Sequence, residues 1–425
     1  MTSGAALSGR RRLSVGEVDL IVAAHEKFVS GRPGGKRADL RFVDLSGFDL
    51  TNRNLTDADL SASILDGARL SGAQLERANL FGSDLRKADL RKANLKRADL
   101  RGACLRGANL SGADLTGADL RVGQIARPHP SKGLASVTHE ERFGQLDNAI
   151  LTGATLDGSQ MNEASVFAAD FTDCSLKGAI LTKANLKDAN LSGAILDGAD
   201  VAGANLDGAN LSYTVMNGVN VKSARTATGT DLRGAVSDPT PQAISRAPQL
   251  LAQMQANHAW CRSGGKDGRP AMLDGEDLRP LADALRSLKG LRLAAMSARN
   301  AIMVGLDLRG VHLQGANLEG ADLRGAVLNG GDLRGARLAQ ANLTKADLRE
   351  VLLSPLPLGR DRETKGSLAG ARLRYAQLQR ADLGKVVFDG ADIRGCDVTG
   401  ADLSAASLRD VDLHGAIGFD QARAA

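Results

Sequence analysis

The sequence predicts an all-β solenoid, a fold in which very short strands and corners repeat along the chain. Every fifth residue from Leu40 to Leu120 is a leucine. A period of five fits neither an α-helix, which repeats every 3.6 residues, nor a long strand, which alternates every two. Aromatic residues make up only 3% of the chain, whereas glycine contributes 49 residues. The core is therefore expected to be narrow and regular, filled by leucine and alanine instead of large rings.

Each five-residue copy has the same internal pattern. Alanine often stands two residues before the leucine, as Ala88 does before Leu90, with aspartate or asparagine between them. Side chains two apart share one face of an extended segment, so alanine and leucine should point inward and Asp89 outward. Glycine often follows two residues after the leucine, as at Gly67. That position suits the third residue of a type II turn, where the backbone angle φ is positive.

The repeat returns in three further blocks, which span residues 146–221, 308–353 and 368–413. The step from Leu120 to Leu146, between the first block and the second, is one more than a multiple of five, so residues 121–145 are expected to be a true insertion. The last two blocks share one register with ten additional residues between them, which predicts a protruding loop at 354–367. The stretch 273–303 matches less well, since Asp283 and Ala298 occupy central positions.

A solenoid needs a cap at an end that would otherwise expose strand edges and an apolar cross-section. Ser14 and Glu17 form a capping box at the start of a helical pattern over 14–30, and a second helical pattern covers 248–262. An ungapped alignment of His25–Leu40 with His258–Leu273 places His25 opposite His258. We interpret both histidines as polar cap residues that bond the solenoid edge. The expected parts are a flexible N-terminus at 1–12, a capped solenoid at 13–235, a linker with a second cap at 236–272, and a second solenoid at 273–425.

Copies such as Ala88-Asp89-Leu90 resemble the pentapeptide-repeat family, whose consensus is A(D/N)Lxx. The resemblance implies a right-handed quadrilateral β-helix with four pentapeptides per coil, so that each face recurs at every fourth pentapeptide. Some family members bind DNA gyrase, either protecting it from quinolones or imitating duplex DNA, so gyrase or topoisomerase modulation is one hypothesis. The net charge of +5 argues against a DNA mimic, which needs a negative surface.

The cysteine pattern indicates the cellular compartment of the protein. The four cysteines show no CxxC spacing, which argues against a disulfide framework or a zinc ribbon and favours a reducing compartment. No signal peptide or membrane span is expected. The sequence therefore predicts a cytoplasmic, bacterial protein without cofactors.

A basic belt is the first candidate binding surface, because cations occupy the outward corner positions around about one coil. One hypothesis is the binding of nucleic acid, an acidic protein patch or lipid headgroups. The alternative is a solvated surface balanced by Asp84, Asp89 and Asp99, because no aromatic residues are interleaved for base stacking. The basic belt comprises Arg86, Lys87, Arg91, Lys92, Lys96, Arg97, Arg101 and Arg106.

The two insertions are the other candidate contact sites. His129 and His139 lie in the first, and a metal site there is one hypothesis; a mobile polar loop is the other, since no HxxxH or HExxH spacing exists. Arg360 and Arg362 lie in the second insertion.

No convergent acid–base set is visible in the sequence. The sequence thus favours a non-enzymatic binding or scaffold protein that engages a protein partner through its faces and loops, with gyrase modulation or binding to nucleic acid or another anionic surface through residues 86–106 as alternatives.

Overall fold

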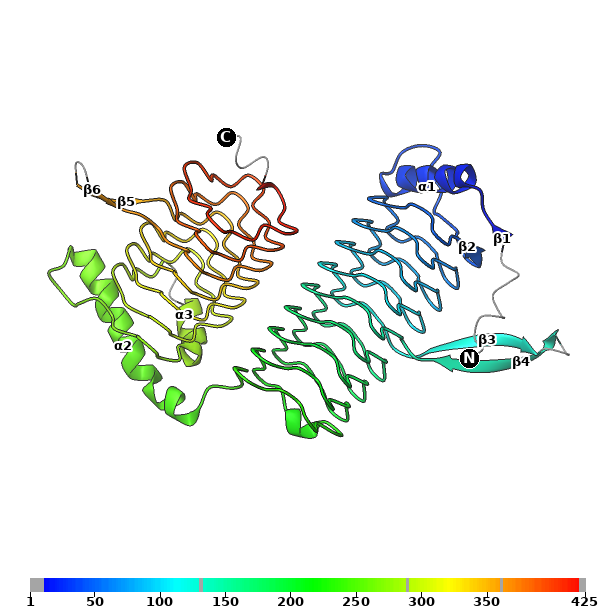
Figure 1. The fold of residues 1–425 in the computed structure, drawn as a ribbon, viewed down its shortest axis with the longest axis horizontal. Coiled ribbons are helices and arrows are strands. Elements are labelled where there is room, and N and C mark those ends of the chain that lie inside the picture. Colours follow the sequence, from blue (N-terminus) through cyan, green and yellow to red (C-terminus); the bar gives the residue numbers. More distant parts are fainter. Residues whose placement is uncertain (1–10, 130–132, 288–289, 360–361, 420–425) are drawn as a thin grey trace. The chain divides into compact units, whose positions relative to one another are not determined.

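The computed structural model describes residues 11–129, 133–287, 290–359 and 362–419 (Figure 1). The chain divides into two compact units, Met1–Asp238 and Pro239–Ala425, which we call the first and second unit. Each unit is a stack of β-helical coils closed at its N-terminal end by a helix.

The coils stack through one parallel bridge on each side. The residue before each central leucine pairs with its equivalent four pentapeptides later, as Asp39 does with Asp59 and Asp59 with Asn79. Around that bridge, the Leu60 amide donates to the Asn79 carbonyl at 2.8 Å. Four such sides complete each turn, so the predicted coil of four pentapeptides is confirmed.

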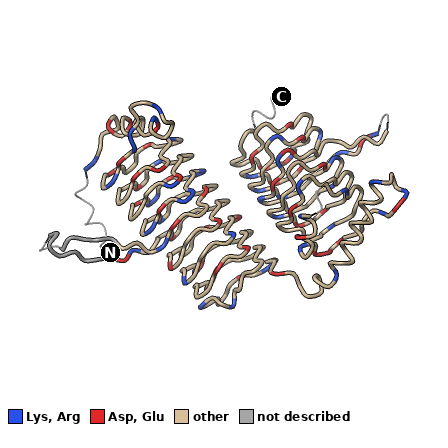
Figure 2. Tube along the Cα trace, turned by 180° about the vertical axis from the view of Figure 1, so that it is seen from behind, with Lys and Arg blue, Asp and Glu red and all other residues tan. Residues whose placement is uncertain are grey.

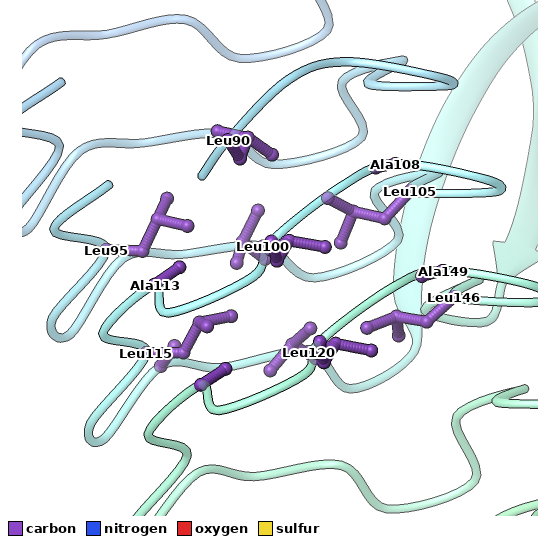
Figure 3. Packing of buried hydrophobic residues seen from close by; sticks show 14 of the residues in the cluster. Leu90, Leu95, Leu100, Leu105, Ala108, Ala113, Leu115, Leu120, Leu146 and Ala149 are labelled. Carbon is purple, nitrogen blue, oxygen red and sulfur yellow. The ribbon is translucent and has the colours of Figure 1, made fainter. Parts of the chain in front are cut away.

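Leucine and alanine fill the inside of each coil, as expected. Figure 3 shows Leu90, Leu95, Leu100 and Leu105 pointing into the stack, and all four side chains are fully buried. Burying one such side chain contributes about 1.5–3 kcal/mol, so the repeated leucine ladder is the main source of stability. At the corners, the residue two after leucine has a positive φ, +63° at Gly67.

Helix α1 (Val15–Val29) closes the first unit. Ser14 caps it with the expected capping box to Glu17, and Val18, Val22 and His25 are buried against the first coil. Strand β1 (Arg11–Arg12) pairs in parallel with β2 (Val43–Asp44). Arg11 and Arg12 thus do not belong to a flexible terminus, because the open edge of the first coil gives them a strand to pair with.

Helix α2 (Pro241–Ser263) caps the second unit, burying Leu250, Met254 and Asn257. The first coil after it contains the 3₁₀ helix η2 (Arg279–Leu281) and helix α3 (Ala282–Ser287), which lengthen that coil. Its bridge from Met272 therefore reaches Ser297, one pentapeptide further along the chain than the regular bridges do. Asp283 lies in α3, which explains why the repeat is interrupted there. A further 3₁₀ helix, η1 (Val221–Ser223), lies in the last coil of the first unit.

Both insertions form antiparallel β-hairpins instead of the loops expected from sequence. The first hairpin pairs β3 (Gly123–His129) with β4 (Gly133–Arg142), and the second pairs β5 (Leu356–Gly359) with β6 (Arg362–Thr364). The coil ladder resumes directly after each of them, with bridges Cys104–Gln145 and Arg337–Ser367. Each hairpin is therefore added to a coil without interrupting the stack.

The cap residues of the two units correspond differently from the alignment. His25 Nδ1 accepts a hydrogen bond from the Ala38 amide at 3.0 Å, as expected of a cap residue. In the second unit Asn257 Oδ1 accepts from the Ala271 amide at 3.0 Å, so Asn257 is the structural counterpart of His25. His258 instead accepts from the Arg292 amide through Nδ1 at 3.1 Å.

This cap makes the first unit sensitive to pH. Burial lowers the pKa of His25, because the fully buried imidazole is poorly solvated when charged. As pH falls below about 6.5, the unfolded chain binds a proton that folded His25 does not, so the free energy of unfolding decreases until pH reaches the lower folded pKa. We expect His25→Asn, which copies the second unit's cap residue, to reduce the fall in melting temperature between pH 7 and pH 5. An unchanged pH dependence in that variant would contradict the assignment.

Candidate functional site

Most arginines of the basic belt are paired within their own coil. Nη2 of Arg86, Arg91 and Arg101 lies 2.5, 2.6 and 2.7 Å from the carboxylates of Asp84, Asp89 and Asp99, respectively. Those are the carboxylates that the solvated-surface hypothesis named. Figure 2 shows the same mixture of basic and acidic residues along both units.

These pairs form a recurring corner motif, Asp-Leu-Arg. In Asp89-Leu90-Arg91 the guanidinium donates through Nε and Nη2 to both carboxylate oxygens, and the Arg91 amide donates to Oδ1 at 3.2 Å. The side-chain hydrogen bonds raise the pKa of Arg91 and lower that of Asp89. A sequence search for Asp two residues before Arg could have found this motif. Further copies occur at Arg41, Arg121, Arg233, Arg279, Arg309, Arg324, Arg334 and Arg349, and Arg394 forms the same pair in an Asp-Ile-Arg variant.

Two more belt residues find carboxylates on the next coil. Lys96 Nζ lies 3.1 Å from Asp114, and Arg106 Nη2 lies 3.1 Å from Asp147. The guanidinium of Arg101 also lies over the ring of Phe81, at 5.5 Å from its centroid. With these contacts, five of the eight cations of the belt are paired with a carboxylate.

Three exposed cations, Lys87, Lys92 and Arg97, form no ion pair with any described residue; we call them the corner cations. They occupy three successive corners with φ of +55°, +57° and +55°, a conformation that disfavours side chains. Glycines of the next coil lie beside them: a β-carbon added at Gly107, Gly112 or Gly117 would stand 3.9, 3.7 or 3.6 Å from the Cγ of the respective corner cation. Of the eight cations of the basic belt, only these three therefore have no ion pair with a described residue.

The bases of the two hairpins are attached to the coils in the same way as each other. A β-carbon on Gly102 would stand 3.2 Å from Gly123 Cα at the base of the first hairpin, and one on Gly335 would stand 2.7 Å from Leu356 Cβ in the second. Each hairpin base therefore packs on a glycine corner of the preceding coil. Both glycines occupy the regular corner position, but their contact with the hairpins was not anticipated from sequence.

The remaining predicted site residues lie in the hairpins. The side chains of residues 125–140 lie outside the described part, so the structure places only the backbones of His129 and His139, opposite Gly133 and Ala126. Arg360 also lies outside the described residues, while Arg362 is exposed in β6. Among the described side chains, no group of three or more His, Cys, Asp or Glu residues could hold a metal ion.

Three of the four cysteines lie in surroundings that disfavour thiol reactivity. Cys174 and Cys396 are buried in the inner stack and donate to the carbonyls of Leu151 and Leu373 at 2.9 and 2.8 Å. Burial raises the pKa of the Cys104 thiol, which disfavours the reactive thiolate. Separately, none of the described helices has the length and apolarity needed to cross a membrane.

Comparison with models of known protein families assigns this chain to a family. A family model described as pentapeptide repeats matches overlapping segments that together span residues 36–121, 169–225, 297–354 and 367–417, more than half of the chain. Comparison with curated proteins finds no match.

Several solved structures are similar to parts or most of the chain. A pentapeptide repeat protein from the thylakoid lumen of Arabidopsis thaliana is 30% identical, over 32% of this chain and 68% of its own, with a TM-score of 0.18. HetL, a pentapeptide repeat protein from the cyanobacterium Nostoc, is 22% identical over 96% and 98%, with a TM-score of 0.13. QnrB1, a plasmid-mediated fluoroquinolone resistance protein, is 19% identical over 51% and 95%, with a TM-score of 0.26. On the strength of the matched repeats, the chain belongs to the pentapeptide-repeat family and adopts its right-handed quadrilateral β-helix.

Proposed function

We propose that this chain is a non-enzymatic binding protein whose two hairpins contact a protein partner while the coils hold them rigidly. The observation that carries the proposal is the continuity of the ladder across both hairpins. After the first hairpin, the Leu105 amide donates to the Gln145 carbonyl at 2.7 Å; after the second, the Leu338 amide donates to Ser367 at 2.7 Å. None of the described side chains of either hairpin joins the inner stack, which supports a role for the hairpins outside the fold.

The attachment of the hairpins also supports this role. Each base packs on a glycine corner, so the strands leave the coil with a defined direction. Solenoids commonly use inserted segments on a rigid scaffold to recognise partners, and a hairpin offers two strand edges as well as its side chains. The inner stack of leucine and alanine offers no acid–base pair for catalysis in the described coils.

Affinity capture from a bacterial lysate tests the class of partner. The full chain is immobilised and exposed to lysate with and without nuclease, at low and high salt. We expect a specific protein to be retained under all four conditions. Capture that is lost with nuclease or with modest salt would overturn the protein-partner proposal and favour anion binding through the belt.

The corner cations favour one second function, binding of nucleic acid or another anionic surface. Three unpaired charges on successive corners could each contact one phosphate. If they do, Lys87→Gln, Lys92→Gln and Arg97→Gln together should weaken binding to a duplex DNA fragment and reduce the slope of log K against log salt by about three. The paired arginines provide the control: Arg86→Gln, Arg91→Gln and Arg101→Gln should change the slope less. Equal slopes for the parent and the corner-cation variant would exclude this function.

Gyrase modulation is a third hypothesis, which rests on family membership alone. The fluoroquinolone resistance protein is too distant in sequence to carry its activity to this chain. Gyrase subunits among the captured proteins would favour this hypothesis over an unrelated partner. We also propose a cytoplasmic location, on the basis of the cysteine pattern.

A further inference from the structure

The second unit contains a cavity between the C-terminal end of α2 and the coils that follow it. Its volume is about 280 Å³. The side next to α2 is formed by the end of the helix and the turn that follows, and the other side by equivalent residues of two successive coils, since Arg292 and His312 pair in the ladder. The residues that matter for its chemistry are Trp260, Cys261, Gly265, Arg292, His312 and Gln314.

The lining is rich in hydrogen-bond donors and carries one unpaired positive charge. Arg292 is exposed, and its guanidinium forms no ion pair with any described residue. Trp260 Nε1 forms no hydrogen bond with the described residues either. Among the described residues that line the cavity, none is acidic. An anion that enters it would therefore meet donors without a competing carboxylate on the wall.

The carboxylate of Asp332 contacts one residue of the lining, and its charge is paired with Arg334. Gln314 Nε2 donates to Asp332 Oδ2 at 2.7 Å, and Arg334 Nη2 lies 2.7 Å from the same oxygen. The hydrogen bond to Asp332 holds the Gln314 amide in place at the edge of the cavity. Arg334 therefore offsets the charge of Asp332, and Arg292 is the only Lys or Arg among the described residues of the lining.

The backbone around the cavity is also held in place. His258 Nδ1 accepts a hydrogen bond from the Arg292 amide at 3.1 Å, which ties the coil to α2 next to the cavity. Gly265 has φ of +92°, and a β-carbon there would stand 3.4 Å from Trp260 Nε1. The glycine therefore lets the chain turn after α2 without covering the indole nitrogen.

We propose that this cavity binds a small metabolite that carries a phosphate or carboxylate group. The planar guanidinium of Arg292 suits a bidentate contact with such an oxyanion, and the indole adds an N–H donor and a flat apolar surface. A volume of about 280 Å³ is near the lower end of small-molecule pockets, which suits a small ligand. This site lies in the second unit and is independent of the partner proposed for the hairpins.

The chain supplies its own probe for this pocket, because Trp260 is its only tryptophan. The full chain is titrated with glucose 6-phosphate, inorganic phosphate, acetate and uncharged glucose while tryptophan emission is recorded. We expect a saturable change with at least one of the three anions and none with glucose. A response to phosphate compounds but not to acetate identifies the phosphate group as the ligand chemistry, and the reverse identifies the carboxylate.

Arg292→Gln removes the proposed anion contact and should weaken the binding of the responding anion by at least about tenfold. Arg337→Gln is the matched control, because Arg337 is also exposed and directly precedes a central leucine, but does not line the cavity. It should leave the affinity unchanged. Equal affinity in the Arg292 variant and the parent, an equal response to glucose, or no saturable response to any anion would overturn the proposal.

Discussion

Leu90→Lys is expected to lower the free energy of unfolding of the first unit by more than about 4 kcal/mol, since an unpaired ammonium would be forced into an apolar stack. Leu90 is fully buried and lies among the leucines of Figure 3. The coil is so narrow that the lysine side chain has no route to water without opening the ladder. Thermal unfolding followed by circular dichroism measures the effect.

Asp89→Lys is the matched control, because it places the same residue one position earlier, on the outward face. It breaks the pair with Arg91, whose Nη2 lies 2.6 Å from the carboxylate, and that pair is partly exposed. A surface ion pair is worth about 0–1 kcal/mol, so the melting temperature should fall only slightly. Similar melting temperatures for the two variants would show that the inward and outward positions are wrongly assigned.

Gly144→Ala and Gly366→Ala should each destabilise the unit that contains them by about 1–3 kcal/mol or more. Both glycines occupy the inward position two residues before a central leucine, where alanine stands in most copies. Each follows a hairpin. A β-carbon would stand 2.1 Å from the Leu120 carbonyl oxygen at Gly144 and 2.3 Å from the Leu353 carbonyl oxygen at Gly366. Because these obstacles are backbone atoms, the clash can be relieved only by moving the coil or the base of the hairpin.

Gly16→Ala is the control for these substitutions. Gly16 lies in α1, and an added β-carbon would have no neighbour within 4 Å. Alanine is favoured over glycine in a helix by about 1 kcal/mol, so the melting temperature should rise slightly or stay the same. If Gly144→Ala and Gly366→Ala behave like Gly16→Ala, the hairpins do not return to the coils through these tight contacts.

The coils were predictable because each pentapeptide repeats the same local choice of inward and outward residues. Leu90 and Asp89 need only their own neighbours to define which way they point. The hairpins were not predictable to the same degree. Their strands lack the repeat period. Their bases pack on the coil because Gly102 and Gly335 have no side chain in the way, and this contact forms only once successive coils are stacked.

The site was partly predictable for a related reason. The basic belt could be located by counting corners, but its neutralisation depends on the bend between Asp89 and Arg91, which brings a carboxylate and a guanidinium two residues apart face to face. The cap was misaligned by one residue, because Asn257, and not His258, accepts the hydrogen bond from the Ala271 amide that corresponds to the bond between His25 and Ala38. The cavity beside Trp260 combines a helix end with two coils that are distant in sequence, so no local pattern indicates it.

Removal of the hairpins tests the central proposal most directly. Deleting residues 123–143 with Val122→Gly, and residues 356–365 with Pro355→Gly, restores the five-residue spacing between the flanking central leucines and places glycine at each corner. Circular dichroism must first show that the shortened chain retains its β-helix and its melting temperature. The measurement is the amount of the captured partner that this chain retains relative to the full chain. We expect retention to be lost; undiminished retention would show that the coil faces, and not the hairpins, bind the partner.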